Sequence, residues 1–383
     1  NYASSLRDLN RAEEAVPHLR HALLSAPGDP QLLGSLGNCL TDLEKFVEAE
    51  TVYRSAVALN PDHAGAGYNL ALFLLRAGIL DEGLKCYESR WRLPGWRRRP
   101  FPVDNWSGDL AGLRGKRLLV WGEQGLGDEI LFSGSLQALL DGGADVTLEC
   151  ESRLVPLIQR SWPDISVYPA LDPADAELQS QHFDLQTSIG SLPHFLGVSS
   201  ANDFGRYPPV LVPDTGLVER LRRKYQGEDN ALVVGISWRS GASTIASRKS
   251  VALELWGEVL ELPGIRFVDL QYGDTTAERL RVEQNTGRRL LHDPDVDSNH
   301  DLDTFAAQVA AMDQVITISN ATAHFAGALG IPTDLLLSNG ALWHWFSGTA
   351  GSPHYPSVKV HRQEVPGDWS VLLSRIAGRL KAA

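Results

Sequence analysis

The sequence has 383 residues, of which 43% are hydrophobic and 21% charged, and this length allows two or three domains with buried cores. A formal net charge of −12 argues against a general nucleic-acid-binding protein, which needs a basic surface. No apolar run approaches the roughly 20 residues that cross a bilayer. The three cysteines form no C-x-x-C pair, so the composition predicts neither a disulfide framework nor structural zinc and favours the cytoplasm. The chain begins inside a predicted helix and shows no secretory leader.

A repeat with a period of 34 residues covers residues 1–95. Pro27 recurs as Pro61, Leu36 as Leu70, and Leu40 as Leu74. Small residues recur where helices approach closely, large residues recur where they fill the gap, and proline ends each unit. The pattern is similar to the tetratricopeptide repeat, which stacks helix pairs into a solenoid with a concave face. Two interpretations remain, a groove for a peptide or protein, or a surface for self-association.

Beyond a connector at 96–115, rich in Pro, Trp and Gly, short apolar runs alternate with amphipathic ones. This alternation predicts parallel sheets covered by helices. Strands are expected at 117–121, 145–150, 166–168 and 185–188, and then at 232–237, 266–271, 314–319 and 334–337. Helices are expected at 128–141, 153–161, 255–262, 321–329 and 369–380. We therefore predict a first Rossmann-like lobe at 116–205, a linker at 206–230, and a second lobe at 231–365. Ligands of such folds bind at the carboxyl ends of the strands.

The first of these strand ends is a glycine-rich loop, G-E-Q-G-L-G-D-E. Gly125 and Gly127 allow close approach of the backbone, and Asp128 is placed to cap the following helix. The spacing differs from the G-x-G-x-x-G of dinucleotide-binding folds, and no Gly-Lys-Ser/Thr follows, which excludes a Walker phosphate loop.

Two loops of the second lobe carry groups suited to an anion. The first strand of this lobe ends at Ser237, Trp238 and Arg239, and the loop beyond reaches Arg248 and Lys249, whose charges suit a diphosphate or simply face solvent.

The segment VITISNATAHFAGALGIP predicts a buried strand, a polar turn and a helix that starts near residue 321. The free amides and positive end of this helix favour a bound anion at Asn320, Thr322 and His324, although His324 could also be a core residue.

The glycine-rich loop, the A-x-A-H-x-A-x-A-L-G-x-P helix and F-V-D-L-Q-Y-G resemble bacterial tetratricopeptide-linked glycosyltransferases. These are related to the family 9 heptosyltransferases and to the O-linked N-acetylglucosamine transferases. The resemblance implies a GT-B fold, in which two Rossmann-like lobes face a cleft, and a C-terminal helix at 366–383 that braces the first lobe.

The same resemblance assigns roles to the site residues. Asp128 is implied as the general base of an inverting transfer, with Glu129 and Glu123 as nearby substitutes. Gln271 and Tyr272 are implied near the nucleotide base, and Trp345 and Tyr355 as walls. One departure is Ser319-Asn320, where relatives carry Asp-Thr or Asp-Ser, and it leaves the donor sugar and the level of activity open.

The leading hypothesis is therefore transfer of a sugar from a nucleotide sugar, without metal or other cofactor, to a hydroxyl of a protein held by the repeats. Flagellin or another bacterial surface protein is an acceptor by analogy alone. The alternatives are a non-catalytic scaffold with a degenerate transferase fold, and an enzyme acting on lipid-linked or small glycans. Oligomerisation through the repeats also remains open.

Overall fold

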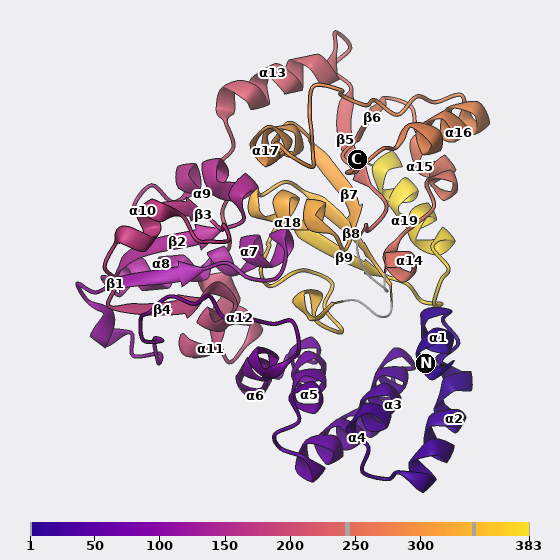
Figure 1. Cartoon of the computed structure of the whole chain (residues 1–383). Coiled ribbons are helices and arrows are strands. Elements are labelled where there is room, and N and C mark those ends of the chain that lie inside the picture. The colour runs from indigo at the N-terminus through magenta and orange to yellow at the C-terminus, as the bar shows by residue number, and fades with distance from the viewer. Residues whose placement is uncertain (1, 242–245, 339–341, 383) are drawn as a thin grey trace.

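The computed structural model describes residues 2–241, 246–338 and 342–382. A curved row of helices forms the base of the molecule, and two parallel sheets covered by helices lie above it (Figure 1). None of the helices described here is long and apolar enough to span a membrane.

The helical row consists of paired antiparallel helices, as the 34-residue period predicts. Asp29 caps α3 by accepting from the amides of Gln31 and Leu32, and proline at the first helical position suits that start. The alternation of small and large residues has a direct cause at Gly37, where an added Cβ would lie 2.5 Å from the ring of Tyr53. The helices are α1 (Tyr2–Asp8), α2 (Ala12–Ser25), α3 (Pro30–Asp42), α4 (Phe46–Leu59), α5 (Ala64–Arg76) and α6 (Leu80–Tyr87), followed by the 3-10 turn η1 (Glu88–Arg92).

The first lobe is a four-stranded parallel sheet in the order β3-β2-β1-β4. Its strands are β1 (Arg117–Trp121), β2 (Asp145–Cys150), β3 (Ser166–Pro169) and β4 (Leu185–Ser188). Its helices are α7 (Leu126–Ser133), α8 (Ser135–Asp141), α9 (Val155–Ser161), α10 (Ala176–Ser180), α11 (Leu192–Phe195) and α12 (Ala201–Arg206), with 3-10 turns η2 (Ala111–Leu113), η3 (Ser152–Leu154) and η4 (Ile189–Ser191).

The second lobe is a five-stranded parallel sheet in the order β6-β5-β7-β8-β9. Its strands are β5 (Leu232–Ser237), β6 (Ile265–Asp269), β7 (Gln314–Ile318), β8 (Thr333–Leu337) and β9 (Val358–Arg362). Its helices are α13 (Thr215–Gln226), α14 (Ala246–Lys249), α15 (Gly257–Leu260), α16 (Thr276–Thr286), α17 (Leu302–Ala310), α18 (Ala321–Ala328) and α19 (Ser370–Lys381), with 3-10 turns η5 (Leu253–Trp256) and η6 (Trp343–Trp345).

The structure differs from the sequence-based expectation at several elements. The helix expected at 128–141 is divided at Gly134, where an added Cβ would lie 2.2 Å from the carbonyl oxygen of Tyr207, so the chain after α12 passes against the break. The strand β9 was not expected. The segment expected as a linker, 206–230, contains α13, whose first amides are capped by Asp214.

The C-terminal helix α19 also packs differently from the expectation that it braces the first lobe. Its apolar face, which includes Leu373 and Ile376, lies in one apolar cluster with Trp256 and Val259 of the second lobe. Burial of this face against its own lobe is the physical reason for the difference.

A continuous apolar core joins the repeats to both lobes. Leu75, Leu84 and Tyr87 of the repeats belong to the same cluster of buried side chains as Leu118 of β1 and Trp343 of η6. Polar contacts reinforce this junction, because Arg76 donates from Nε to Ser347 Oγ at 3.2 Å. The repeats therefore pack directly against both lobes.

Candidate functional site

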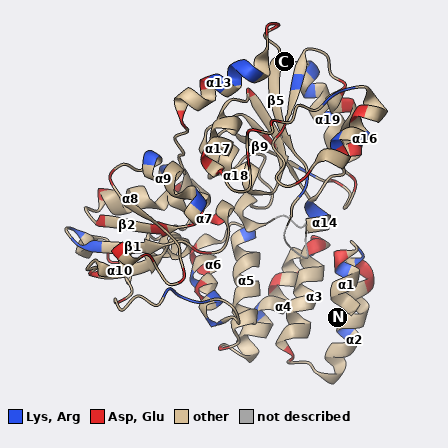
Figure 2. Ribbon diagram, turned by 45° about the horizontal axis from the view of Figure 1, so that its top comes forward, with Lys and Arg blue, Asp and Glu red and all other residues tan. Residues whose placement is uncertain are grey.

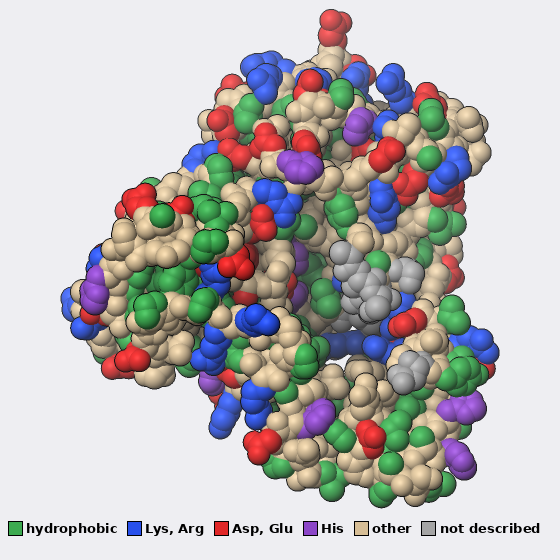
Figure 3. Space-filling model, viewed as in Figure 1, with side chains coloured by type: hydrophobic (Ala, Val, Ile, Leu, Met, Phe, Trp, Pro, Cys, Tyr) green, Lys and Arg blue, Asp and Glu red, His purple; other side chains and the backbone are tan. Residues whose placement is uncertain are grey.

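A cavity of about 480 Å³ lies between the two lobes. Figure 3 shows the molecular surface hollowed between the lobes, above the repeats. The first lobe contributes Leu126, Gly127, Asp128 and Arg153. The second lobe contributes Ser240, Lys249, Tyr272, Ser298, Asn299, Leu302, Phe305, Ser319, Asn320, Ala321, Thr322, His324, Phe325, Leu342 and His344.

The glycine-rich loop brings the first lobe into contact with the second. An added Cβ at Gly127 would lie 2.6 Å from the His324 ring in α18, so only a glycine allows this approach. The amide of Gly125 donates to Asp128 Oδ2 at 3.3 Å, which fixes Asp128 in the first turn of α7. The loop therefore presents the Asp128 carboxylate to the cavity.

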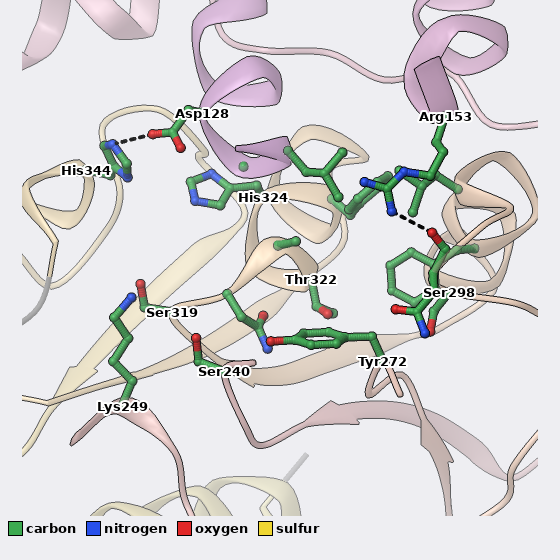
Figure 4. A pocket seen from close by; sticks show the side chains of 18 of the residues that line it. Asp128, Arg153, Ser240, Lys249, Tyr272, Ser298, Ser319, Thr322, His324 and His344 are labelled. Carbon is green, nitrogen blue, oxygen red and sulfur yellow. Dashed lines mark hydrogen bonds and ion pairs between the residues drawn. The ribbon is translucent and has the colours of Figure 1, made fainter. Parts of the chain in front are cut away.

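Asp128 faces a histidine that the sequence-based reasoning did not identify. His344 Nε2 lies 3.2 Å from Asp128 Oδ1 (Figure 4). Burial by itself would raise the pKa of Asp128, but the contact with His344 and the hydrogen bond from the Gly125 amide outweigh burial, so that pKa lies below its usual value. Asp128 is therefore an ionised carboxylate at neutral pH, with its side chain 20% exposed.

His324 is held in a fixed orientation by aromatic neighbours. Its Nδ1 lies 2.9 Å from the hydroxyl of Tyr355, and its ring lies 5.0 Å from that of Trp345. Burial, with a smaller contribution from nearby His344, lowers the pKa of His324 to about 3, so the imidazole is neutral. Its Nδ1 is engaged with Tyr355, and the opposite edge of the ring faces Gly127.

The start of α18 forms one wall of the cavity, since Asn320, Ala321 and Thr322 all line it. The Asn320 side-chain amide donates to Ser237 Oγ at 2.7 Å, which ties the end of β7 to the end of β5. Trp345 Nε1 donates to Ser319 Oγ at 2.9 Å from behind this turn. The helix start is thereby fixed with its amide end toward the cavity, an arrangement that suits an anion.

Lys249 lies across the cavity from Asp128, on the short helix α14 (Figure 4). The residue is 8% exposed, and within the described ranges the structure gives its ammonium group no carboxylate partner. Burial lowers the pKa of Lys249, while the charge of Asp128 acts in the opposite direction. A buried cation beside a helix start, without a paired anion, suits a phosphorylated ligand.

Several residues predicted for the site lie outside the cavity. Gln271 accepts through Oε1 from Ser237 Oγ and from the amides of Trp238 and Arg239, at 3.1, 2.9 and 2.8 Å. This residue therefore organises the loop after β5, while its neighbour Tyr272 reaches the cavity. The indole of Trp238 donates to Glu278 Oε1 at 2.8 Å, and Trp345 stands behind His324 as a supporting wall.

The two predicted arginines are also turned away from the cavity. Arg239 Nε lies 3.1 Å from Glu278 Oε2, and Arg248 Nη2 lies 2.9 Å from Asp42 Oδ2 in the repeats. Each guanidinium thus has a carboxylate partner elsewhere. Residues 242–245 of the same predicted phosphate loop lie outside the described residues.

Two carboxylates considered as substitutes for Asp128 have other partners. Glu123 pairs with Arg90 at 2.7 Å. Glu129 turns toward the end of β2, where its Oε2 accepts from the amide of Glu151 at 2.9 Å. Burial raises the pKa of Glu129 to about 8, with the charges of Glu151 and Asp128 adding to the effect.

We expect Glu129 to make the stability of the protein depend on pH. The folded-state pKa of this carboxyl lies above its unfolded value of 4.5. Its contribution to the free energy of unfolding is therefore complete below pH 4.5 and is lost as pH rises toward 8, by at most about 1.4 kcal/mol per pH unit. Glu129→Gln keeps the bond to the Glu151 amide and should remove this decline. Melting temperatures at pH 5 to 9 would measure it, and equal slopes for the variant and the wild type would contradict the assignment.

Other cavity residues were missed because no motif marks them. Arg153 follows β2, donates to Asn299 O at 2.6 Å, and so connects the lobes at the rim of the cavity. Ser298 and Asn299 come from a loop before α17 with no strand-end signal. Within the described ranges, no group of three or more His, Cys, Asp or Glu is arranged to hold a metal.

Comparison with known proteins agrees with this architecture. The tetratricopeptide repeat family matches residues 3–64 and 42–91. Protein FlbA of Caulobacter vibrioides is 30% identical over 434 residues, an alignment that covers 100% of this chain and 72% of FlbA. The chain belongs to the FlbA family.

Two solved structures show the fold of the two lobes. A glycosyl transferase of family 9 from Veillonella parvula superimposes with a TM-score of 0.52 and 14% identity, covering 70% of this chain and 90% of that protein. The E. coli ADP-heptose LPS heptosyltransferase II gives a TM-score of 0.50 and 14% identity, covering 70% and 98%. The predicted repeats followed by a GT-B fold are therefore confirmed.

Proposed function

We propose that this chain is a glycosyltransferase that binds a nucleotide sugar between its two lobes. The observation that carries this proposal is the convergence of three groups on one cavity: the start of α18, the Lys249 ammonium, which has no carboxylate partner among the described residues, and the Asp128 carboxylate. The first two suit the phosphates of the donor, and the third suits the acceptor hydroxyl.

The proposed reaction is an inverting displacement. The acceptor oxygen forms a bond to the anomeric carbon while the bond from that carbon to the phosphate oxygen breaks. Asp128 receives the proton of the acceptor hydroxyl. The departing nucleotide takes the electron pair, and Lys249 with the amides of α18 stabilises its charge without a metal ion.

We further propose that the acceptor is a protein hydroxyl, because the repeats pack beneath the same cavity and their solenoid type binds peptides. Flagellin or another bacterial surface protein is the proposed acceptor class. Co-expression of candidate acceptors followed by intact-mass measurement would detect the added sugar. An unmodified protein together with a modified lipid-linked or small glycan would redirect the acceptor assignment.

The donor site is tested by thermal shift with ADP, GDP, UDP, CDP and TDP, followed by titration of the nucleotide that stabilises most. Lys249→Ala should weaken that nucleotide about tenfold or more, because it removes a charge-assisted contact. Lys359→Ala changes an exposed lysine of the same lobe and should leave the affinity within about twofold. Stabilisation by none of these nucleotides or their sugar conjugates would favour the non-catalytic scaffold, a possibility that the Ser319-Asn320 departure keeps open.

A further inference from the structure

Two adjacent residues of α14 connect different parts of the molecule. Lys249 lines the cavity, whereas Arg248 contacts the repeats. Successive side chains of a helix are about 100° apart, so one turn of helix can serve both surfaces. Figure 2 shows the basic α14 beside the ends of α1 and α3.

Asp42, the last residue of α3, is the anchor for this contact. Its Oδ2 lies 2.9 Å from Arg248 Nη2 and 2.7 Å from Arg7 Nε, so one carboxylate is shared by two guanidinium groups. The Arg248 and Asp42 side chains are only 8% and 6% exposed. Arg248 Nε also donates to Asn10 Oδ1 at 3.2 Å. Buried and multiply bonded, this contact is screened far less than a surface ion pair.

The helix α14 needs such anchors because a single helical turn is not stable alone. Its C-terminal side is held to the end of β5, where the amide of Val251 donates to Trp238 O at 2.8 Å and Ser250 Oγ accepts from the amide of Ser240 at 3.0 Å. On its other side, Arg248 holds it to Asp42 and Asn10 of the repeats. Lys249 lies between these two attachments, so its place in the cavity depends on both.

We propose that Asp42 and Arg248 are positioning residues that hold Lys249 in the donor cavity, and that donor affinity therefore depends on helices α1–α3 of the repeats. This inference rests on the proposed donor site. It extends the role of the repeats from acceptor binding to control of the donor, since a protein that displaces α1–α3 would release α14. When α14 is already held in place before the ligand binds, less conformational entropy is lost on binding.

The sharpest change is Asp42→Asn. It leaves Arg7 and Arg248 facing each other without the carboxylate between them, and like charges at this separation repel. We expect α14 to move and the nucleoside diphosphate chosen by the thermal-shift panel to bind about tenfold more weakly. Arg248→Gln should act in the same direction from the other partner, while Arg248→Lys should recover part of the affinity. The matched control is Glu82→Gln, which breaks an exposed pair with Arg54 within the repeats and should leave the affinity within about twofold.

A second measurement follows Lys249 directly. Reductive methylation with labelled formaldehyde, read by mass spectrometry, should modify Lys249 slowly in the wild type and about tenfold faster in Asp42→Asn, in line with release of a buried side chain. The exposed Lys359 provides the internal reference. Circular dichroism establishes that each variant is folded.

Wild-type labelling of Lys249 in folded Asp42→Asn and Arg248→Gln overturns the inference, whatever the affinity. Faster labelling of Lys249 with unchanged nucleotide affinity overturns the claim that the repeats control donor binding. Faster labelling in a protein that binds no nucleotide at all supports the positioning of Lys249 and overturns the proposed function instead.

Discussion

Asp128→Asn is expected to lower the turnover number for sugar transfer by roughly a hundred- to ten-thousand-fold, the usual contribution of a positioned general base. Asparagine has the same shape and can still accept from the Gly125 amide, but it cannot take the acceptor proton. Nucleotide affinity should therefore stay within about twofold of the wild type. Turnover is measured by mass spectrometry of the glycosylated product, and affinity by titration.

The pH dependence of this reaction gives a second readout. Because His344 and the Gly125 amide lower the pKa of Asp128 despite its burial, the base should remain ionised at pH values where an ordinary aspartate becomes protonated. Transfer should therefore continue at those pH values. Asp164→Asn, which changes an exposed carboxylate of the same lobe, is the matched control. Normal turnover by Asp128→Asn would remove Asp128 from the base assignment without affecting the donor site.

Arg90→Met should lower the free energy of unfolding by about 3–5 kcal/mol, as expected when one partner of a buried ion pair is removed. The Arg90 side chain is 0% exposed and lies 2.7 Å from both Glu123 and Glu88. It also donates to Ser191 Oγ at 2.8 Å and lies over the ring of Trp91 at 4.2 Å. Its loss leaves two carboxylates without their cation at the junction between the repeats and the glycine-rich loop. Calorimetry and urea titration would measure the change.

Arg54 offers a matched control, since it also pairs with two glutamates, Glu50 and Glu82, but is 43% exposed. Arg54→Met should cost no more than about 1 kcal/mol. The double variant Arg90→Met with Glu123→Gln should recover part of the lost stability, because it removes one of the two orphaned charges. A loss of under 1 kcal/mol in Arg90→Met would show that the junction does not depend on this ion pair.

Much of the fold could be predicted because its patterns are local. The 34-residue period specifies the repeats, and the apolar run of β5 matches the predicted strand at both ends. The strand β9 was missed because Val358–Arg362 contains only two apolar residues. The other three, Lys359, His361 and Arg362, are polar, so the segment resembles part of the surface. Its pairing with β8 depends on distant residues, which a local pattern does not contain.

The site was predicted less completely for the same physical reason. Asp128, Lys249, Asn320, Thr322 and His324 reach the cavity as expected from strand-end loops. Charge alone could not show that Arg248 would turn to Asp42, since that carboxylate lies 206 positions earlier in the sequence. Nor could it identify His344, whose contact with Asp128 exists only because the lobes meet at Gly127. Residues that follow strands could be found, whereas partners contributed by other parts of the chain could not.

Because one apolar core extends from Leu75 and Tyr87 of the solenoid to Trp343 of the second lobe, the solenoid is not an independent domain. Severing the chain near residue 95, where the sequence period changes, would strip the covering from buried aromatic and aliphatic side chains on both fragments, and exposed patches of this kind cause aggregation. A transplanted solenoid could replace the outer helices only if α5 and α6 stayed in place. The two lobes and the innermost helix pair, α5 and α6, therefore fold as one unit.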